Sequence, residues 1–277
     1  MTVRSGGRKD ASGRTGGFSR RGFLEAALFA FAAVGVGLAM GAPQAHAETV
    51  RIGTEGAYPP FNYTTDDGKL AGFDIDIANA LCDEMKVECS FVAQDWDGII
   101  PALIAGRYDA IIASMSITPD REEVVLFTDP YYRSPAAFLT LEEGGVTDTS
   151  PAGLADKTIG VQAAATHAKY VEDKHPDSDN KQYRTLDDAV LDLQSGRVDV
   201  VMGDKLALHD WAHDKAKGLK FVGEDITAVE YFGPGIGIAL RKEDSALREK
   251  FNTALKAIVA DGTYEKINAK YFPFSIR

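Results

Sequence analysis

The chain contains one ten-residue sequence pattern twice, and this repeat constrains the fold more than any other feature. Residues 105–114 read AGRYDAIIAS and residues 195–204 read SGRVDVVMGD, at a constant offset of 90 positions. In each copy Gly-Arg, an apolar residue and Asp precede an apolar run that ends in a polar residue, Ser114 or Asp204. Gly near the end of a periodic segment is typical of a helix terminus, and the apolar run is typical of a buried strand. The pattern therefore predicts the same helix–turn–strand unit in two places.

Strands and helices are expected to alternate along the rest of the chain. Apolar strands are predicted at 49–53, 89–93, 110–113, 158–161, 182–185, 198–202 and 236–240. Helices are predicted at 73–85, 96–105, 166–174, 186–195, 206–216 and 247–272, the last with a break at Gly262. A further helix opens at Thr118-Pro119, with Thr as its N-cap and Pro at its first position. Continuous apolar strands between amphipathic helices are typical of mainly parallel α/β sheets.

The repeat places Ser114 and Asp204 at equivalent positions of two sheets. Ligands of open α/β sheets bind beyond the carboxyl ends of the strands. We therefore expect two similar α/β lobes with a binding cleft between them. The alternative is that both copies are ordinary helix-to-strand turns, but the constant offset and the polar end of each copy weigh against it.

The first 47 residues are expected to be an export signal. Ser-Arg-Arg-Gly-Phe-Leu at 19–24 precedes an Ala- and Gly-rich apolar stretch at 26–40, and Ala45-His46-Ala47 supplies the small residues that a signal peptidase reads. The paired arginines favour a twin-arginine signal over a plain secretory one. The apolar stretch is short and weakly hydrophobic, which argues against a permanent membrane anchor. Either signal would place a mature chain that begins at Glu48 outside the cytoplasm.

The mature part is strongly acidic. Residues 48–277 carry 24 basic and 39 acidic side chains, a formal net charge of −15. Nucleic acids and anionic membranes demand a basic face, so both are poor candidates as partners. The chain contains no GxSxG elbow, P-loop, HExxH motif or metal-spaced Cys/His cluster, so neither a cofactor nor a metal is expected. We expect a monomer.

The two cysteines, Cys82 and Cys89, lie near the end of the helix predicted at 73–85. Their spacing does not match a CxxC redox or zinc motif. In an oxidising compartment we expect a disulfide that closes a short loop, which the chain-entropy model values at about 2.5 kcal/mol. Two buried free thiols are the alternative.

Several short motifs together resemble one protein family over essentially all of 49–277. They are GTEGAYPPF at 53–61, GFDID at 72–76, the Cys82/Cys89 pair, DAII at 109–112, SIT at 116–118 followed by Arg121, GVQ at 160–162 and Tyr271-Phe272. The chain is similar to the extracytoplasmic solute-binding proteins of polar amino-acid ABC importers, most closely the lysine/arginine/ornithine, histidine and opine receptors. The resemblance implies a periplasmic-binding-protein-like clamp of two lobes, each a mainly parallel sheet with flanking helices. The chain would cross between the lobes near 132–138 and 231–236. Lobe 1 would comprise 48–134 and 235–277, and lobe 2 would comprise 135–234.

The resemblance also assigns two charged anchors. An amino acid carries a carboxylate and an ammonium, and a dry cleft must pair both. Arg121 would hold the carboxylate, because a guanidinium grips it bidentately and free helix N–H groups favour the same charge. Asp204 would hold the ammonium. The alternatives are a surface arginine that pairs with Glu122 or Glu123, and an aspartate that caps the helix predicted at 206–216.

Further site residues follow from the resemblance. Ser114, Ser116 and Thr166 would add polar contacts, with ordinary turn or cap chemistry as the alternative. Tyr58 and Trp96 would sandwich the ligand side chain, although core packing is the commoner fate of an aromatic residue. Glu55 follows the first strand and would face a distal ammonium or guanidinium.

The chain departs from the family pattern near the expected site. Ala164 stands where relatives usually carry Gly, and Ala165 where many carry Ser. Ala113 replaces a frequent Ser, and Glu55 replaces an Asp of several relatives. His167 lies close by. It either edges the pocket or is a surface or cap residue, which is the more common role of a lone His on a helix.

The resemblance implies a periplasmic, non-enzymatic receptor that delivers arginine, lysine, ornithine, histidine or a derived opine to an ABC permease. A receptor for a neutral polar amino acid such as glutamine is the main alternative. A cyclohexadienyl dehydratase-like enzyme on the same fold, with Glu55 or His167 as acid or base, is a further alternative. A sensory receptor domain is a third.

Overall fold

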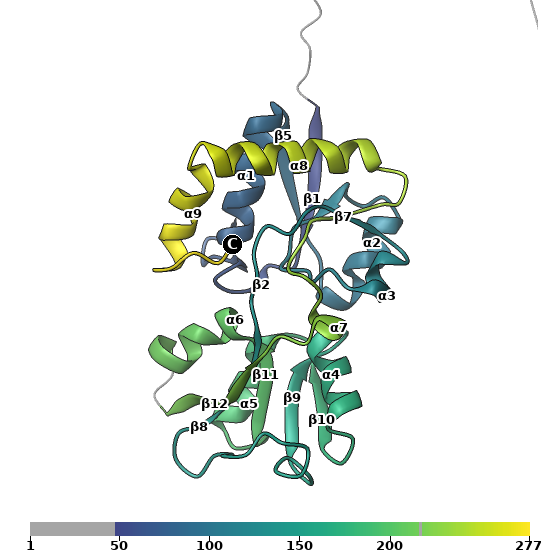
Figure 1. The fold of residues 1–277 in the computed structure, drawn as a ribbon. Coiled ribbons are helices and arrows are strands. Elements are labelled where there is room, and N and C mark those ends of the chain that lie inside the picture. The colour runs from purple at the N-terminus through teal and green to yellow at the C-terminus, as the bar shows by residue number, and fades with distance from the viewer. Residues whose placement is uncertain (1–47, 216–217) are drawn as a thin grey trace, which may run out of the picture. The chain divides into compact units, whose positions relative to one another are not determined.

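The computed structural model describes residues 48–215 and 218–277, which belong to one compact unit. The predicted export signal lies outside the described residues. Within the described part of the chain, no helix has the length and apolar character needed to cross a bilayer. Figure 1 shows two lobes, each built on its own sheet and connected by segments of chain that pass between them.

The first lobe contains a sheet in the order β5-β1-β6-β13-β7. Its strands are β1 (Thr49–Thr54), β5 (Glu88–Ala93), β6 (Ala110–Ile111), β7 (Leu126–Phe127) and β13 (Ala239–Leu240). Its helices are α1 (Phe73–Met85), α2 (Ile99–Ile104), which follows a 3₁₀ turn at Trp96–Gly98, α3 (Pro119–Glu122), α8 (Ser245–Ala260) and α9 (Thr263–Tyr271). A small antiparallel sheet, β2 (Ala57–Tyr58), β3 (Asn62–Thr64) and β4 (Leu70–Ala71), lies between β1 and α1 in the chain.

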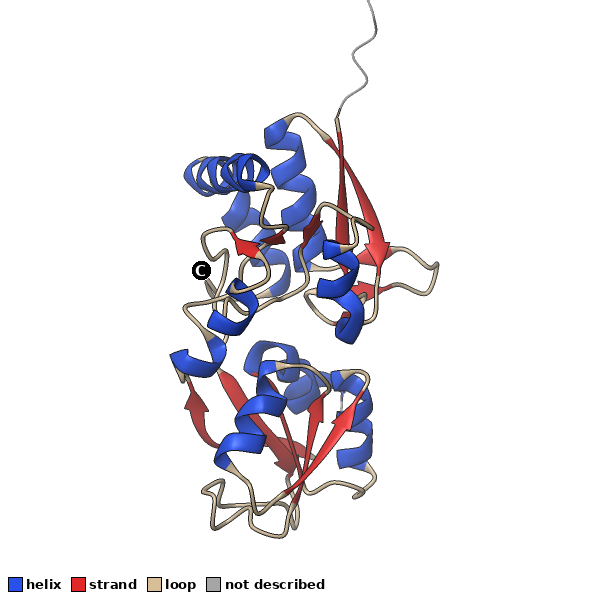
Figure 2. Cartoon of the chain, turned by 90° about the vertical axis from the view of Figure 1, so that its right-hand side faces the viewer, coloured by secondary structure: helices blue, strands red, loops and turns tan. Residues whose placement is uncertain are grey.

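The second lobe contains a sheet in the order β10-β9-β11-β8-β12. Its strands are β8 (Ala136–Leu141), β9 (Thr158–Gln162), β10 (Asp179–Tyr183), β11 (Val200–Asp204) and β12 (Leu219–Ile226). Its helices are α4 (Thr166–Lys174), α5 (Leu186–Gln194), α6 (Lys205–Asp210), which continues as a π-helical turn at Trp211–Lys215, and α7 (Val229–Phe232). Figure 2 shows the helices packed against the strands in both lobes.

Both sheets are mainly parallel, as expected, and each has one reversed strand among the described residues. In the first sheet β13 runs antiparallel to β6 and β7, and in the second sheet β8 runs antiparallel to β11 and β12. These two strands are the ones that follow the passages of the chain between lobes. A chain that arrives from the other lobe enters at the carboxyl edge of the sheet, so it must run against the other strands.

The two passages lie side by side. The backbone N–H of Tyr131 donates to the carbonyl of Ile236 at 2.9 Å, and the N–H of Ile236 donates to the carbonyl of Tyr132 at 2.9 Å. The Nε of Arg133 donates to the carbonyl of Pro234 at 3.0 Å. These residues lie in or next to the segments predicted to cross, 132–138 and 231–236.

The repeated sequence pattern forms the same structure twice. Gly106 and Gly196 adopt left-handed backbone conformations, with φ of 74° and 69°, that end α2 and α5. Asp109 Oδ2 then accepts a hydrogen bond from the backbone N–H of Arg51 at 3.0 Å. Asp199 Oδ2 accepts one from the N–H of Thr158 at 2.8 Å. Asp109 therefore links the start of β6 to β1, and Asp199 links the start of β11 to β9.

The helix α1 packs on the first sheet with the face that its sequence predicts. Ile75, Ala78 and Leu81 are all buried. Cys82 at its C-terminal end forms a disulfide with Cys89 at the start of β5, which confirms the pairing and removes the free-thiol alternative. The disulfide joins α1 to the edge strand of the sheet.

Several predicted boundaries were wrong. The strand predicted at 182–185 is Asp179–Tyr183, and the strand at 198–202 is Val200–Asp204. The helix predicted at 206–216 is α6 followed by the π-helical turn. The strand β12 and the small β2–β4 sheet were not predicted. Residues of β12 are mostly exposed or half-buried because it is an edge strand that pairs only with β8.

Candidate functional site

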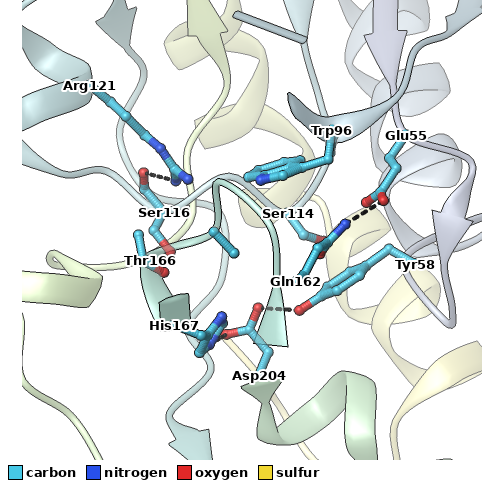
Figure 3. A pocket seen from close by; sticks show the side chains of 12 residues that line it. Glu55, Tyr58, Trp96, Ser114, Ser116, Arg121, Gln162, Thr166, His167 and Asp204 are labelled. Atoms are coloured by element: carbon cyan, nitrogen blue, oxygen red, sulfur yellow. Dashed lines mark hydrogen bonds and ion pairs between the residues drawn. The ribbon is translucent and has the colours of Figure 1, made fainter. Parts of the chain in front are cut away.

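The carboxyl ends of the strands in both lobes border one cavity (Figure 3). It encloses about 310 Å³ of space that atoms do not fill, part of it open to solvent. All eight predicted site residues line it. The twelve lining residues are Glu55, Tyr58, Trp96, Ala113, Ser114, Ser116, Arg121, Gln162, Ala165, Thr166, His167 and Asp204.

One wall carries the guanidinium of Arg121, which forms no ion pair with another described residue. Arg121 lies in α3, and Thr118 is the N-cap of this helix, as predicted, with its Oγ1 accepting from the Arg121 N–H. The Arg121 Nη1 donates to the carbonyl of Ser116 at 3.0 Å, and the guanidinium lies over the Trp96 ring at 5.2 Å. Within the described residues no ion pair joins Arg121 to a carboxylate, and its guanidinium lies at the cavity against Ser116 and Trp96 instead of against Glu122 or Glu123. Burial lowers the pKa of Arg121 to about 10, which leaves it charged at neutral pH.

The opposite wall carries the carboxylate of Asp204, which has only a histidine within ion-pair distance among the described residues. Asp204 ends β11, and the residue is only 6% exposed. It holds the N-cap position of α6, but its side chain makes no capping hydrogen bond, so the capping alternative holds only for the backbone position. Its Oδ2 accepts from the Tyr58 hydroxyl at 2.7 Å, and its Oδ1 lies 3.8 Å from His167 Nε2. Burial raises the pKa of Asp204, while His167, the Tyr58 hydrogen bond and Arg121 oppose the shift.

A second buried carboxylate of the cavity belongs to Glu55, which follows β1. Gln162 Nε2, from the end of β9, donates to Glu55 Oε1 at 2.6 Å across the two lobes. Burial raises the pKa of Glu55 to about 7, and the hydrogen bond from Gln162 opposes the rise only in part. Gln162 was not predicted as a site residue. The available signal was its position, because it is the polar residue that ends a buried strand, as Ser114 and Asp204 do.

The two predicted aromatic residues reach the cavity in different ways. Tyr58 contributes its hydroxyl to Asp204, and its ring stacks on Phe61 at 6.2 Å. Trp96 lies in the 3₁₀ turn before α2 and places its ring beneath the Arg121 guanidinium. Their proposed sandwich around a ligand side chain stays a prediction.

The hydroxyl of Ser114 is already engaged. Ser114 has a left-handed backbone with φ of 55°, and its Oγ donates to Asp74 Oδ2 at 3.0 Å. Asp74 is fully buried at the start of α1, and it also accepts from Asn62 Nδ2 at 2.9 Å and from the Tyr131 hydroxyl at 2.7 Å. Burial raises the pKa of Asp74 to about 6. Ser114 can therefore offer a ligand its backbone more readily than its hydroxyl.

The helix α4 begins at the cavity. Ala165 holds its N-cap position, and Thr166 and His167 are its first two residues. The free N–H groups of a helix N-terminus favour a negatively charged group, which is the charge that Arg121 also favours. His167 is 6% exposed and lines the cavity, which agrees with the reading that it edges the pocket and not with a surface position. Ala164 is left-handed with φ of 57°, which explains why Gly suits this position.

A family model for bacterial extracellular solute-binding proteins, family 3, matches residues 50–274. The chain belongs to this family. Its lobes, its crossings and its cavity at the carboxyl ends of the strands agree with the resemblance noted from the sequence.

The similarity to individual family 3 proteins is high. The chain is 46% identical over 231 residues to an L-arginine-binding protein of Pseudomonas aeruginosa, which covers 82% of the chain and 89% of the relative. It is 36% identical over 247 residues to a lysine/arginine/ornithine-binding periplasmic protein of Escherichia coli, which covers 88% and 95%. Among solved structures, an ancestral arginine-binding protein bound to arginine matches with a TM-score of 0.76 and 38% identity, over 82% of this chain and 99% of that one.

Proposed function

We propose that this family 3 protein is a periplasmic receptor that binds a basic amino acid and delivers it to an ABC permease. The observation that carries the proposal is the pair of opposite charges on facing walls of one cavity. Within the described residues, no carboxylate forms an ion pair with the Arg121 guanidinium, and the Asp204 carboxylate has only the His167 imidazole within ion-pair distance. An α-amino acid brings the two groups that would complete them. The N-terminus of α4 would add to the hold on the carboxylate.

Glu55 carries the third charge of the cavity and would select the side chain of the ligand. A buried carboxylate with a raised pKa is stabilised by a cation, so Glu55 would favour a ligand with a distal ammonium or guanidinium. The names of the relatives support this choice, since arginine, lysine and ornithine all carry such a group. We place arginine first among the candidates. An opine derived from arginine stays a candidate, because an octopine-binding periplasmic protein of Rhizobium meliloti is 34% identical.

Glutamine is the second candidate ligand, because an ancestral arginine-binding protein of 38% identity has been solved with glutamine bound. A neutral side-chain amide could donate to Glu55. The experiment is isothermal titration of the mature protein with arginine, lysine, ornithine, histidine, glutamine and glutamate. We expect the tightest binding from a basic amino acid. Tightest binding of glutamine or glutamate would refute the proposal of a cationic ligand.

The variant Glu55→Gln tests whether the carboxylate of Glu55 favours a cationic side chain of the ligand. A hydrogen bond to a charged group contributes about 1.5–3 kcal/mol, so the variant should bind a basic amino acid roughly tenfold to a hundredfold more weakly. Glutamine should lose less, because the new amide oxygen can still accept from it. An equal loss for both ligands would show that Glu55 does not read the side-chain charge. Turnover of prephenate or arogenate by the pure protein would instead establish the enzyme alternative.

Export would follow from the leader. We propose that the signal is removed after Ala47, so that the exported protein begins at Glu48. N-terminal sequencing of the exported protein tests the cleavage site. Replacing Arg20-Arg21 by Lys-Lys should stop export by the twin-arginine route. Normal export of that variant would assign the chain to the general secretory route.

A further inference from the structure

His167 is a buried side chain of the cavity that the proposed function leaves without a role. It is the second residue of α4, and its ring packs against Phe232 of α7 with a centroid distance of 5.3 Å. Its Nε2 is buried and has no hydrogen-bond partner among the described residues. A buried polar atom without a partner costs free energy, so such an atom at a binding cavity points to a ligand.

The unpartnered atom faces Asp204. The distance from His167 Nε2 to Asp204 Oδ1 is 3.8 Å, which is too long for a hydrogen bond. The other carboxylate oxygen of Asp204 is occupied by the Tyr58 hydroxyl at 2.7 Å. Oδ1 and Nε2 are therefore two atoms of this wall that can accept a hydrogen bond from a new donor. Figure 3 shows the His167 ring beside the Asp204 carboxylate.

The imidazole is in its neutral form at neutral pH. Burial lowers the pKa of His167, the carboxylate of Asp204 opposes the shift, and the guanidinium of Arg121 adds to it. A neutral imidazole has one N–H and one lone pair, and which nitrogen holds the proton depends on the partners of each. An ammonium has three donors and no acceptor, so it is matched by a site that offers several acceptors.

We propose that His167 is a ligand-binding residue whose Nε2 lone pair accepts a hydrogen bond from the α-ammonium, beside Asp204 Oδ1. The proton of the ring then lies on Nδ1. The carboxylate supplies the charge and the imidazole supplies a second acceptor direction, so that two of the three N–H donors of the ammonium are bound by lobe 2. This assignment rests on the proposed function only in that the ligand is an α-amino acid.

The test compares ligands with and without the α-ammonium. Wild type, His167→Phe and His167→Gln are titrated with L-arginine and with 5-guanidinopentanoate, which is arginine without its α-amino group. His167→Phe keeps a ring against Phe232 and removes the acceptor, so arginine should bind roughly tenfold more weakly or worse. The deamino analogue should change by less than about twofold, because it lacks the donor that His167 would accept from. His167→Gln restores an acceptor oxygen and should recover part of the arginine affinity.

The matched control is His175→Phe. His175 is also buried in lobe 2 and its ring contacts Phe138, but it does not line the cavity. It should leave both affinities unchanged. Equal weakening of arginine and the deamino analogue by His167→Phe would overturn the proposal, since it would indicate a packing role.

A spectroscopic measurement separates an acceptor from a donor. In protein labelled with ¹⁵N-histidine, Nε2 of His167 should give the signal of an unprotonated nitrogen, shifted on addition of arginine. A protonated Nε2 in the complex would mean that His167 donates to Asp204 and would overturn the assignment. If the titrations select a neutral amino acid, the proposed function fails, and the same His167 test proceeds with that amino acid and its deamino analogue.

Discussion

The two copies of the repeat have the same architecture but different ends. In each, a left-handed Gly ends a helix and an Asp carboxylate binds the backbone N–H of the neighbouring strand, at 3.0 Å from Asp109 and 2.8 Å from Asp199. The last residue then differs. Ser114 turns its hydroxyl inward to Asp74, whereas Asp204 presents its carboxylate to the cavity. The shared residues build the lobe, and the residue that differs decides what the lobe offers a ligand.

The copies also differ in how firmly the shared Asp is held. Asp109 forms ion pairs with Arg51 at 2.7 Å and with Arg241 at 3.4 Å. Asp199 has a single ion pair, with Lys157 at 3.7 Å, within the described residues. Lobe 1 therefore concentrates charge at its structural turn, and its charge at the cavity belongs to Arg121 of the next helix. Lobe 2 places its charge directly at the end of the repeat.

The largest expected effect is the loss of ligand affinity when the last residue of the second repeat, Asp204, is replaced. Asp204→Ala should weaken binding of the amino-acid ligand about 30-fold to several thousand-fold, because removing one partner of a buried charge pair costs roughly 2–5 kcal/mol. Arg121→Ala should do the same from the other lobe. Ser114→Ala should weaken binding less than about tenfold, because its hydroxyl is bound to Asp74. Isothermal titration of the three variants measures this, and equal losses for Ser114→Ala and Asp204→Ala would contradict it.

The second prediction concerns the shared aspartates. Asp109→Ala should lower the free energy of unfolding by about 2–3 kcal/mol, and Asp199→Ala by about 1 kcal/mol, because Asp109 loses more charge-assisted hydrogen bonds. The hydrogen bond from Arg51 is the main cause that holds the pKa of Asp109 below its usual value. A lowered pKa in the folded state stabilises the protein above the unfolded pKa, and this contribution is lost as pH falls. The penalty of Asp109→Ala should therefore shrink below about pH 4.

Denaturant unfolding of both variants from pH 7 to pH 3 checks this prediction. The Asp199→Ala variant serves as the control for loss of the shared backbone hydrogen bond. A penalty of Asp109→Ala that does not change with pH would show that packing, and not charge, holds the turn of lobe 1.

The smallest effect concerns one strained residue in each lobe. Ser114 and Ala164 both have left-handed backbones, with φ of 55° and 57°. Ala164→Gly should raise the free energy of unfolding by up to about 1 kcal/mol, since Gly adopts this conformation without the cost of a Cβ. The greater freedom of Gly in the unfolded chain offsets part of that gain. Ser114→Gly should give no gain because it also loses the hydrogen bond to Asp74.

Thermal unfolding of the two variants decides this. A gain of 1 kcal/mol corresponds to a rise in Tm of about 2–4 °C for a folded chain of this size. Destabilisation by Ala164→Gly would mean that the unfolded-chain entropy outweighs the backbone strain at this position.

Strong periodicity and local start signals predicted much of the fold. The bounds of α1 and α4 agree with the sequence, and Thr118-Pro119 opens α3 as expected. The edge strands β10 and β12 lack an apolar run because they are half-exposed, so their positions depend on pairing with a neighbour. The last two residues of β11 are in the strand because Gly203 and Asp204 pair with β8. Such pairing is a tertiary effect that local propensity does not contain.

The site was predicted as a set of residues but not as a network. Motif positions and strand ends placed eight side chains at one cavity. Their partners could not be predicted, because they are far apart in the chain. Gln162 bonds to Glu55 over a separation of 107 residues, and Ser114 bonds to Asp74 over 40. The sequence left open whether His167 edges the pocket or lies on the surface, since the start of a helix does not reveal which side meets the other lobe.

The pairing of the two passages between the lobes has a mechanical consequence. Two separate strands would let the lobes twist as well as bend, whereas the bonds between Tyr131, Tyr132 and Ile236 join them into one ribbon. Two paired segments of this kind bend about one axis more easily than they twist. Any opening and closing of the lobes would then have a single soft degree of freedom. If the lobes open and close about these paired segments, we expect the two walls of the cavity to separate and return in the same register, so that little orientational entropy is lost when they meet.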